Sequence, residues 1–322
     1  MTQYIEQNII IPPHLEGKRF DQALSWLWPH YSRTRIQQWI KQGKVTANGE
    51  KIRGKDLVQG GESIFLRAEL IEEETWGPEE IPLDIIYEDE AILVINKPPN
   101  LVVHPSESTP CHTLVNGLLA RYPELIQLPR AGIVHRLDKD TTGLLVVARQ
   151  VEAHHSLVEQ LQKRTMGRHY EALVQGILTG GGTVDAPISR DKIHRKRMAV
   201  VPHGKPATTH YRILERFIAH TRIEVTLETG RTHQIRVHMA YLHHPLVGDP
   251  VYGGRPRFPK DAPESLMEAL QQFKRQALHA KELHFLHPIS QQPLSFTAPI
   301  PEDMKNLIQH LRSHYDTHHH ST

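Results

Sequence analysis

The pattern of apolar positions near the start of the chain predicts two short helices. Apolar residues recur there at steps of three and four, the spacing of one helical face, in two groups: Phe20, Leu24 and Leu27, followed by Ile36, Trp39 and Ile40. The first group predicts a helix over residues 19–28. The second predicts a helix over residues 31–43, with Ser32 as its N-cap and Gly43 at its end.

A hairpin and a strand follow these helices. Residues 44–52, KVTANGEKI, contain the dipeptide Asn48-Gly49, which is a strong turn signal for a hairpin. In ESIFLR, at 62–67, apolar residues alternate with other residues, which is typical of a half-buried strand. Residues 17–68 are therefore predicted to form a small domain of their own.

The pattern changes after residue 90, where short apolar runs alternate with loops. Five of these runs have the length and composition of strands: Ala91–Ile95, Leu144–Ala148, Tyr170–Gln175, Tyr211–Leu214 and Ile223–Leu227. Residues 154–164 are expected to form a helix between strands. The mixture predicts an α+β domain with a mixed, largely antiparallel sheet over residues 91–310, and a frayed C-terminal tail over 311–322.

Charge divides the chain into three parts. Residues 1–68 carry a net +4, residues 69–90 hold ten acidic and no basic residues, and residues 91–322 carry a net +8. Like charges favour an extended chain, so 69–90 is expected to be an acidic linker. Basic bodies on both sides favour a polyanionic partner, although ordinary solvated surfaces explain the charge equally well. Residues 1–16 form an N-terminal extension without a recognisable motif.

Composition and missing motifs exclude several classes of protein. The single cysteine, Cys111, excludes an intramolecular disulfide and fits a reducing compartment, so we expect a cytoplasmic protein. The first residues lack a signal-peptide pattern, and apolar runs such as Leu144–Ala148 are too short to span a bilayer. The nucleotide-binding patterns GxxxxGK[ST] and GxGxxG and the hydrolase elbow Gly-x-Ser-x-Gly do not occur, so no cofactor is expected.

The densest polar stretch, AGIVHRLDKDTTGLLVVA (131–148), precedes an apolar strand. Five ionisable residues lie within six positions: His135, Arg136, Asp138, Lys139 and Asp140. Two carboxylates this close suggest an acid–base pair, as in glycosidases. The neighbouring cations favour ionised carboxylates instead, which indicates one anionic nucleophile or electrostatic stabiliser. A surface turn with ion pairs would explain DKD alone, but not a turn joined to a buried strand.

Two later stretches add an aromatic and a cationic candidate. Tyr170 enters a strand after a basic segment, where it can stack on a nucleobase, take part in proton transfer, or simply belong to the core. Arg231 follows a strand at a turn, from which it can pair with a carboxylate of another loop. In the helix predicted over HQIRVHMAYL, Arg236 is expected to point away from the apolar stripe. His233 and His238 are five residues apart rather than four, so no metal site is expected.

The helix–helix–hairpin pattern of residues 17–67 resembles the S4 RNA-binding domain. Arg33, Gln37 and Lys41 follow a four-residue step and are expected to share the outer face of the second helix. The resemblance places Arg33, Arg35 and Lys41 against RNA phosphates, where each contact adds a salt-dependent contribution to affinity. A small helical module with a solvated polar face is the alternative.

The three polar stretches together resemble the RluA family of pseudouridine synthases. Four motifs carry the resemblance in family order: HRLDKDTTGL (135–144), LETGRTHQIRVHM (227–239), HPLVGDPVYGG (244–254) and RQALHA (275–280). With the S4-like module, the resemblance covers nearly all of residues 17–302. It implies an isomerase that breaks the base–ribose C–N bond of uridine and forms a C–C bond at C5 of the base, without a cofactor.

The resemblance also implies roles for single residues. Asp138 matches the essential aspartate, expected to act as nucleophile or to assist glycosidic cleavage, and Arg231 matches the arginine that pairs with it. Tyr170 matches a tyrosine that packs on the base, and Arg136 matches a residue that fills the gap left by the flipped nucleotide; His135 beside it is expected to bind substrate. The implied substrate is the loop of helix 69 in 23S rRNA, free or in the assembling large ribosomal subunit. We expect a monomer without a DNA or membrane partner.

Two other functions stay open at the level of sequence. The chain could be only an RNA-binding ribosome-assembly factor that acts through its S4-like module. The joint presence of Asp138, Tyr170 and Arg231 argues against that as its sole function. A carboxylate glycosidase or a nuclease would need a second acid free of cations, or a metal site.

Overall fold

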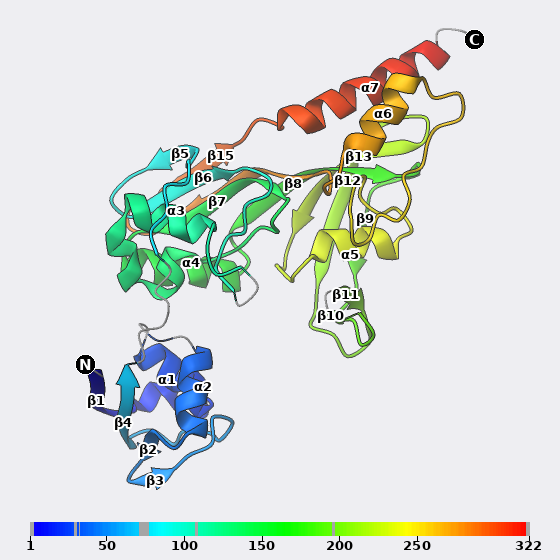
Figure 1. The fold of residues 1–322 in the computed structure, drawn as a ribbon. Helices are drawn as coiled ribbons and strands as arrows, with labels where there is room; N and C mark the ends of the chain where they lie inside the picture. Colours follow the sequence, from blue (N-terminus) through cyan, green and yellow to red (C-terminus); the bar gives the residue numbers. More distant parts are fainter. Residues whose placement is uncertain are drawn as a thin grey trace. The chain divides into compact units, whose positions relative to one another are not determined.

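The computed structural model describes residues 3–28, 31, 33–70, 77–106, 109–194 and 197–319 (Figure 1). The chain divides into two compact units. The smaller unit consists of residues 1–80 with 118–132, and the larger unit consists of residues 81–117 with 133–322.

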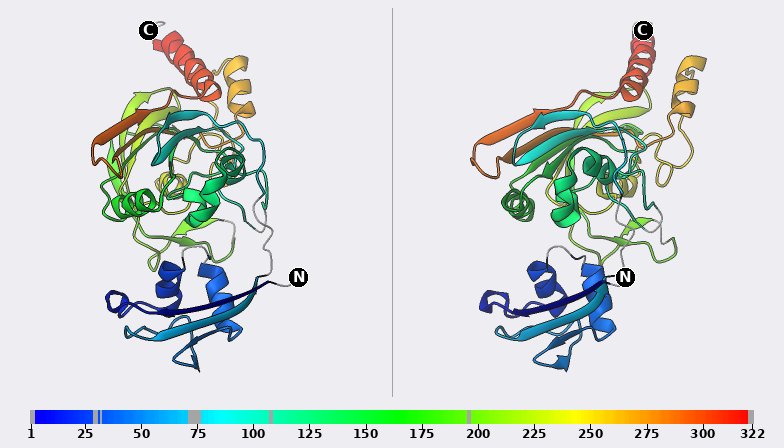
Figure 2. Two further views of the ribbon diagram at one scale, coloured as in Figure 1. Left: turned by 90° about the vertical axis from the view of Figure 1, so that its left-hand side faces the viewer. Right: turned by 60° about the vertical axis from the view of Figure 1, so that its left-hand side comes forward.

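The smaller unit is built on an antiparallel sheet with the strand order β1-β4-β2-β3. Its strands and helices are β1 Gln3–Ile10, α1 Phe20–Leu27, α2 Arg33–Lys41, β2 Val45–Ala47, β3 Glu50–Lys51 and β4 Ser63–Leu70, with a short 3-10 helix η1 at Pro13–Leu15. Both α-helices lie on the same face of the sheet (Figure 2). Apolar residues from the two helices and from the facing side of the strands form one buried core, since each element is apolar on one side only.

The helices and the hairpin predicted for this unit are confirmed. Phe20, Leu24 and Ile36 are buried in its core, as their helical spacing requires. Asn48 and Gly49 both have positive φ, 51° and 82°, which is the backbone of a two-residue hairpin turn. Ser32, expected as an N-cap, lies outside the described residues.

The N-terminal extension is part of this small fold. Strand β1 pairs along its whole length with β4, for example Ile9 with Ile64. Ile11 and Leu15, which follow β1, are completely buried. Residues 3–16 therefore contribute a strand and core side chains to the unit, although they carry no sequence motif.

The larger unit contains, within the described residues, a nine-stranded sheet in which β5-β6-β7-β14-β8-β13-β12-β9 are neighbours and β15 pairs with β14. Its strands are β5 Ile85–Glu88, β6 Ile92–Lys97, β7 Thr142–Ala148, β8 Gly167–Gln175, β9 Gly182–Asp185, β12 Thr208–Arg216, β13 His220–Leu227, β14 Leu278–Leu286 and β15 Pro293–Thr297. All pairs are antiparallel except β7 with β14. The expected largely antiparallel α+β sheet is thus confirmed.

Helices and one hairpin surround this sheet. In the larger unit they are α4 Val151–Gln162, β10 Ile188–Arg190 with β11 Met198–Val200, α5 Gln234–Tyr241, α6 Glu264–Gln272 and α7 Glu302–His319. Helix α3 Leu114–Arg121 contains residues of both units, and the 3-10 helices η2 Pro123–Gln127 and η3 Pro129–Gly132 belong to the smaller unit. Helices α4 and α5 lie on one side of the sheet, and α6 and α7 lie on the other side (Figures 1 and 2).

Two boundaries expected from the sequence are wrong. The segment expected as a frayed tail continues α7 as far as His319, because Leu307 and Leu311 bury one side of that helix against α6. The acidic segment expected as a linker includes β5, which pairs with β6 at the edge of the sheet. In α7 the apolar residues are spaced among polar ones, and in β5 a short apolar run is flanked by acidic residues, so charge content concealed both elements.

A glycine fixes the point where the polar loop enters the sheet. Gly143, near the start of β7, has a φ of +107°, and a Cβ built on it would lie 2.2 Å from the carbonyl oxygen of Ala280 in β14. Only glycine combines that backbone conformation with such a close approach. The loop before β7 is thereby held against β14.

Candidate active site

Asp138 lies in a tight turn immediately before β7. The backbone N–H of Thr141 donates to the carbonyl oxygen of Asp138 at 3.1 Å, which closes the turn. The Asp138 side chain keeps 17% of its surface exposed. A carboxylate that is fixed at its base but open at its tip is accessible to a substrate.

Neighbouring segments hold this turn from two sides. The Asp140 carboxylate accepts a hydrogen bond from the backbone N–H of Asn100 at 3.2 Å. From the other side, Gln276 donates to the Thr141 hydroxyl at 3.0 Å and Arg275 donates to the Asp140 carbonyl at 3.3 Å. Asp140 thus stabilises the turn through its hydrogen bond, and Arg275 and Gln276 of the RQALHA motif stabilise the same turn.

Lys97 is buried beneath the turn. Its ammonium nitrogen donates to the carbonyl oxygens of Pro98, Leu101 and Lys139 at 2.7, 3.0 and 2.8 Å. Burial lowers the pKa of Lys97 to about 7, although the charge of Asp140 acts in the opposite direction. Lys97 therefore joins the end of β6 to the residue that follows Asp138. Its role was not predicted from the sequence, because a lysine at the end of an apolar strand has the usual appearance of a surface residue.

The arginine that pairs with Asp138 is Arg236, and the prediction for Arg231 is wrong. Nη1 of Arg236 donates to Oδ2 of Asp138 at 2.9 Å. The Arg231 side chain instead donates to the carbonyl oxygen of Pro206 at 3.0 Å on the surface. The expectation that Arg236 points away from the core also fails, because every residue of α5 from Gln234 to Met239 is buried.

Arg236 is held by a second carboxylate. Its Nε and Nη2 donate to the two oxygens of Asp249 at 2.7 and 2.9 Å, and its guanidinium lies 5.2 Å from the centre of the Tyr252 ring. Burial alone would lower the pKa of Arg236, but the two carboxylates outweigh burial and raise it overall. Asp249 also accepts the backbone N–H groups of Val251 and Tyr252. Asp249 and Tyr252 of the GDPVYGG motif therefore hold Arg236 in the position from which it pairs with Asp138.

Tyr170 lies in β8, a strand that pairs with β14 and β13. It is buried, with 6% of its surface exposed. Burial raises the pKa of Tyr170; Arg168 opposes that shift, and the charge of Asp138 adds to it. Asp138 and Tyr170 are thus close enough to interact electrostatically.

His135 and Arg136 occupy different environments. His135 accepts the backbone N–H of Val146 with Nε2 at 3.1 Å, and burial lowers its pKa to about 3. This neutral ring supports β7, so its Nε2 is already engaged within the protein. Arg136 is exposed beside the turn, and its charge adds to the effect of burial, which lowers the pKa of His233. Of these two neighbours, Arg136 is the one whose side chain is exposed.

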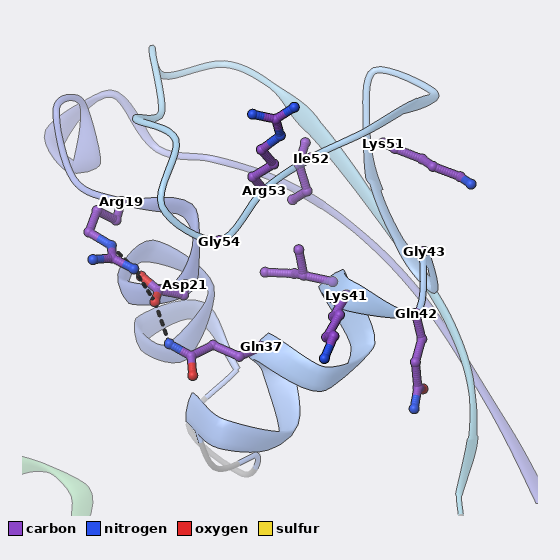
Figure 3. A pocket seen from close by; sticks show the side chains of 11 residues that line it. Arg19, Asp21, Gln37, Lys41, Gln42, Gly43, Lys51, Ile52, Arg53 and Gly54 are labelled. Atoms are coloured by element: carbon purple, nitrogen blue, oxygen red, sulfur yellow. Dashed lines mark hydrogen bonds and ion pairs between the residues drawn. The ribbon is translucent and has the colours of Figure 1, made fainter.

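The smaller unit contains a cavity of about 480 Å³ with cationic walls (Figure 3). Lys41, Lys51 and Arg53 line it, and none of the three forms an ion pair with a described residue. Arg19 and Gln37 line it too, but both donate to the buried carboxylate of Asp21. The cavity therefore offers three cations to an anionic ligand.

The three basic residues expected to bind RNA in this unit have different partners. Arg33 forms an ion pair with Asp21 at 2.9 Å, which ties α2 to α1. The guanidinium of Arg35 lies 5.1 Å from the centre of the Trp39 ring. The outer-face prediction is thus only partly correct: Arg33 is exposed but already paired, whereas Lys41 faces the cavity. Lys51 and Arg53, at the hairpin, were missed.

Some further features can be stated for the described residues only. No cluster of three or more His, Cys, Asp or Glu side chains among them has the arrangement of a metal site. Within the same part of the chain, no helix has the length and apolar character needed to cross a membrane.

Replacing Lys97 tests how the turn is supported. The pKa of Lys97 is about 7 in the folded protein and 10.5 in an ordinary lysine, so between these pH values the unfolded chain binds one more proton. The contribution of Lys97 to stability must therefore rise with pH across that window. We expect the free energy of unfolding of the wild type, relative to Lys97→Met, to rise by about 1.4 kcal/mol per pH unit between about pH 7.5 and 9.5.

Urea unfolding at several pH values measures this difference. Lys139→Met is the matched control, because the Lys139 side chain is exposed while its carbonyl oxygen still accepts from Lys97. The control should follow the wild type at every pH. Parallel curves for the wild type and Lys97→Met would contradict the prediction.

Comparison with known proteins places this geometry among RNA-modifying enzymes. Residues 91–241 match the family model described as RNA pseudouridylate synthase, and residues 18–64 match the S4 domain. The chain is 54% identical over 319 residues to ribosomal large subunit pseudouridine synthase D of Escherichia coli strain K12, covering 99% of this chain and 98% of the relative. It is 55% identical over 314 residues to the protein of the same name from Yersinia pestis, covering 97% of each.

Solved structures show the same similarity. Human RNA Pseudouridylate Synthase Domain Containing 4 superimposes with a TM-score of 0.56 at 25% identity, covering 71% of this chain and 92% of that chain. Human RNA Pseudouridylate Synthase Domain Containing 1 gives a TM-score of 0.53 at 25% identity, covering 73% and 96%.

Proposed function

The chain belongs to the RNA pseudouridylate synthases, and on that premise we propose that it converts uridines in the loop of helix 69 of 23S rRNA to pseudouridine, with Asp138 as the catalytic nucleophile. The enzyme is an isomerase of the pseudouridine synthase D type that acts on ribosomal RNA. We further propose that it works as a monomer in the cytoplasm, on free rRNA or on the assembling large subunit.

The reaction rearranges one nucleotide without net gain or loss of atoms. The bond between C1′ of the ribose and N1 of uracil breaks, a bond between C1′ and C5 forms, C5 loses its proton and N1 gains one. No oxidant or reductant is consumed. The protein has to expose the nucleotide, hold the ribose at a nucleophile, and move a proton from C5.

The ion pair between Asp138 and Arg236 is the observation that carries the proposal. Arg236 fixes one oxygen of Asp138 at 2.9 Å, and the carboxylate tip is partly open. A held anion of this kind is suited to act at C1′ of the ribose. Tyr170, buried nearby, provides a ring for the base and a phenol for the C5 proton.

Arg136 is proposed to fill the space that the target nucleotide leaves when it flips out of the RNA. Its exposed side chain lies two residues before Asp138 and beside the same turn. Flipping costs a few kcal/mol, and the cost is least where bases are already unpaired. A loop substrate is therefore favoured over a continuous duplex.

Mapping of pseudouridine in rRNA tests the proposed function. Cells that lack the protein should lose pseudouridine in the helix 69 loop, and the purified enzyme should restore it on a stem-loop RNA of that sequence. Unchanged modification in those cells would contradict the proposed substrate. Pseudouridine at other uridines would keep the reaction but replace the target.

The cationic cavity of the smaller unit supports the proposal that this unit binds RNA and so contributes to the function alongside catalysis. The alternative function, an RNA-binding ribosome-assembly factor acting through the S4-like domain, draws on the same cations. Rescue of a ribosome-assembly defect by the Asp138→Asn protein would support such an additional role. Failure of that variant to rescue would assign the whole function to catalysis.

Removing the unpaired cations should weaken RNA binding without unfolding the domain. In the variant with Lys41→Ala, Lys51→Ala and Arg53→Ala, three phosphate contacts are lost. The negative slope of log affinity against log salt should therefore become shallower by about 2 to 3. Fluorescence anisotropy of a labelled stem-loop between low and moderate salt measures the slope.

Arg33→Ala is the matched control for that variant. It leaves Asp21 without one of its cations, so it should lower the melting temperature of the domain and change the salt slope little. If Arg33→Ala made the salt dependence of RNA affinity shallower than the triple variant does, the RNA contacts would be assigned to Arg33 and not to the three cavity cations.

A further inference from the structure

His233 lies beside the Asp138 carboxylate and takes no part in the ion pairs of Arg236 with Asp138 and Asp249. It precedes α5 with a φ of 56°, a left-handed conformation that is uncommon for residues other than glycine. Its Nε2 atom lies 3.9 Å from Oδ2 of Asp138, and its side chain is 20% exposed. The ring thus borders the space in which a bound nucleotide would meet Asp138.

Tyr252 determines which ring nitrogen of His233 carries the proton. The phenol oxygen of Tyr252 accepts the backbone N–H of Met198 at 2.8 Å and lies 2.9 Å from Nδ1 of His233. A phenol has one hydrogen to donate, and its oxygen has already accepted a bond. We therefore assign the hydroxyl hydrogen to Nδ1, which leaves the imidazole N–H on Nε2, the nitrogen nearer Asp138.

The surroundings favour the neutral imidazole. Burial lowers the pKa of His233, and the cations Arg236 and Arg136 lower it further, whereas Asp138 and Asp249 act in the opposite direction. A neutral imidazole that presents N–H is a hydrogen-bond donor but a very weak acid. Such a group can stabilise a developing negative charge without transferring its proton.

We propose that His233 is a further catalytic residue, which donates a hydrogen bond from Nε2 to the O2 oxygen of uracil while the glycosidic bond breaks, and that Tyr252 is its positioning residue. The inference rests on the proposed function. When the C1′–N1 bond breaks, its electron pair moves to N1 and spreads onto O2, the base oxygen nearest the ribose. A donor close to the Asp138 carboxylate is therefore close to the atom that gains charge.

Single-turnover kinetics on the helix 69 stem-loop test the role of His233. His233→Leu should lower the rate about 10²-fold and change the dissociation constant for RNA less than about threefold, because the interaction develops in the transition state. His233→Gln, whose amide can present N–H near the same place, should recover the rate to within about tenfold of the wild type.

His243→Leu is the matched control. His243 also has a left-handed backbone, with a φ of 64°, but it lies exposed after the other end of α5. It should keep the wild-type rate, so a loss in His233→Leu cannot be ascribed to strain at such a position. Equal losses in His233→Leu and His233→Gln, or a wild-type rate in His233→Leu, would overturn the proposal.

Tyr252→Phe separates the hydroxyl from the ring. It keeps the aromatic face beside Arg236 and removes the hydroxyl, which orients His233 and also accepts the N–H of Met198, so the rate should fall about tenfold. The double variant Tyr252→Phe/His233→Leu should be no slower than His233→Leu, because the hydroxyl acts through the imidazole. Additive losses would overturn the role given to Tyr252.

These outcomes are distinct from a failure of the proposed function. Wild-type enzyme that forms no pseudouridine on the stem-loop would contradict the proposed helix 69 substrate, on which these assays depend. Active wild-type enzyme whose rate is unaffected by His233→Leu would refute only the role of His233.

Discussion

Asp138→Asn is expected to abolish pseudouridine formation while leaving the fold intact. The substitution removes the anion that would act at C1′, and loss of a catalytic nucleophile lowers rates by at least about 10⁴-fold in enzymes of known mechanism. Stability should change by only about 1 kcal/mol, because Arg236 keeps both hydrogen bonds to Asp249. Pseudouridine yield on the stem-loop RNA and a thermal melt measure the two effects.

Asp140→Asn is the control for this experiment. Asp140 lies two residues further on, and its carboxylate accepts the N–H of Asn100 rather than facing Arg236. An asparagine can still accept that bond through its side-chain oxygen, so the control should lose no more than about tenfold in rate. Appreciable turnover by a folded Asp138→Asn protein, or equal losses at both positions, would remove Asp138 from its proposed role.

The parts of the fold that follow a local pattern could be predicted from the sequence. The hairpin at Asn48-Gly49 and the helix α1 have turn and spacing signals within a few residues, and both are present. The strand over residues 144–148 belongs to β7 because it is apolar throughout, as a strand buried on both faces must be. Helix α7 was missed because its apolar residues lie among histidines and charges.

The arginine at the site could not be found by the same means. A helical-wheel argument assumes that one side of a helix faces water, so a charged residue off the apolar stripe is placed in solvent. Helix α5 is buried all round, and Arg236 is retained there by two carboxylates from residues 138 and 249. Nothing in the immediate sequence distinguishes Arg236 from Arg231, since the partner aspartates lie 98 and 13 residues away.

Lys97 and Tyr252 escaped prediction for a related reason. Each acts through a group that is distant along the chain: Lys97 through the carbonyl of Lys139, and Tyr252 through the ring of His233. Such contacts depend on how loops come together in the folded chain, which residue spacing does not encode. The motifs indicated which loops lie close together, but only the three-dimensional structure shows which atoms in them form contacts.

Arg236→Met is expected to damage both stability and catalysis, whereas Arg231→Met should do neither. Removing Arg236 leaves Asp249, whose side chain is completely buried, without its cation, and an uncompensated buried charge costs about 3–5 kcal/mol. Asp138 loses its only hydrogen-bonded cation among the described residues, so the rate should fall by about 10²–10³-fold even at temperatures where the variant is folded.

Arg236→Lys separates charge from geometry at this position. The guanidinium uses Nε and Nη2 for Asp249 and Nη1 for Asp138, and a single ammonium group cannot reproduce that three-point arrangement. The lysine variant should therefore recover much of the stability but little of the rate. Urea unfolding and single-turnover kinetics on all three variants give the comparison. If Arg231→Met lost more activity than Arg236→Lys, the pairing partner of Asp138 in the working enzyme would be Arg231. The ion pairs of Arg236 with Asp138 and Asp249 would then have to rearrange when RNA binds.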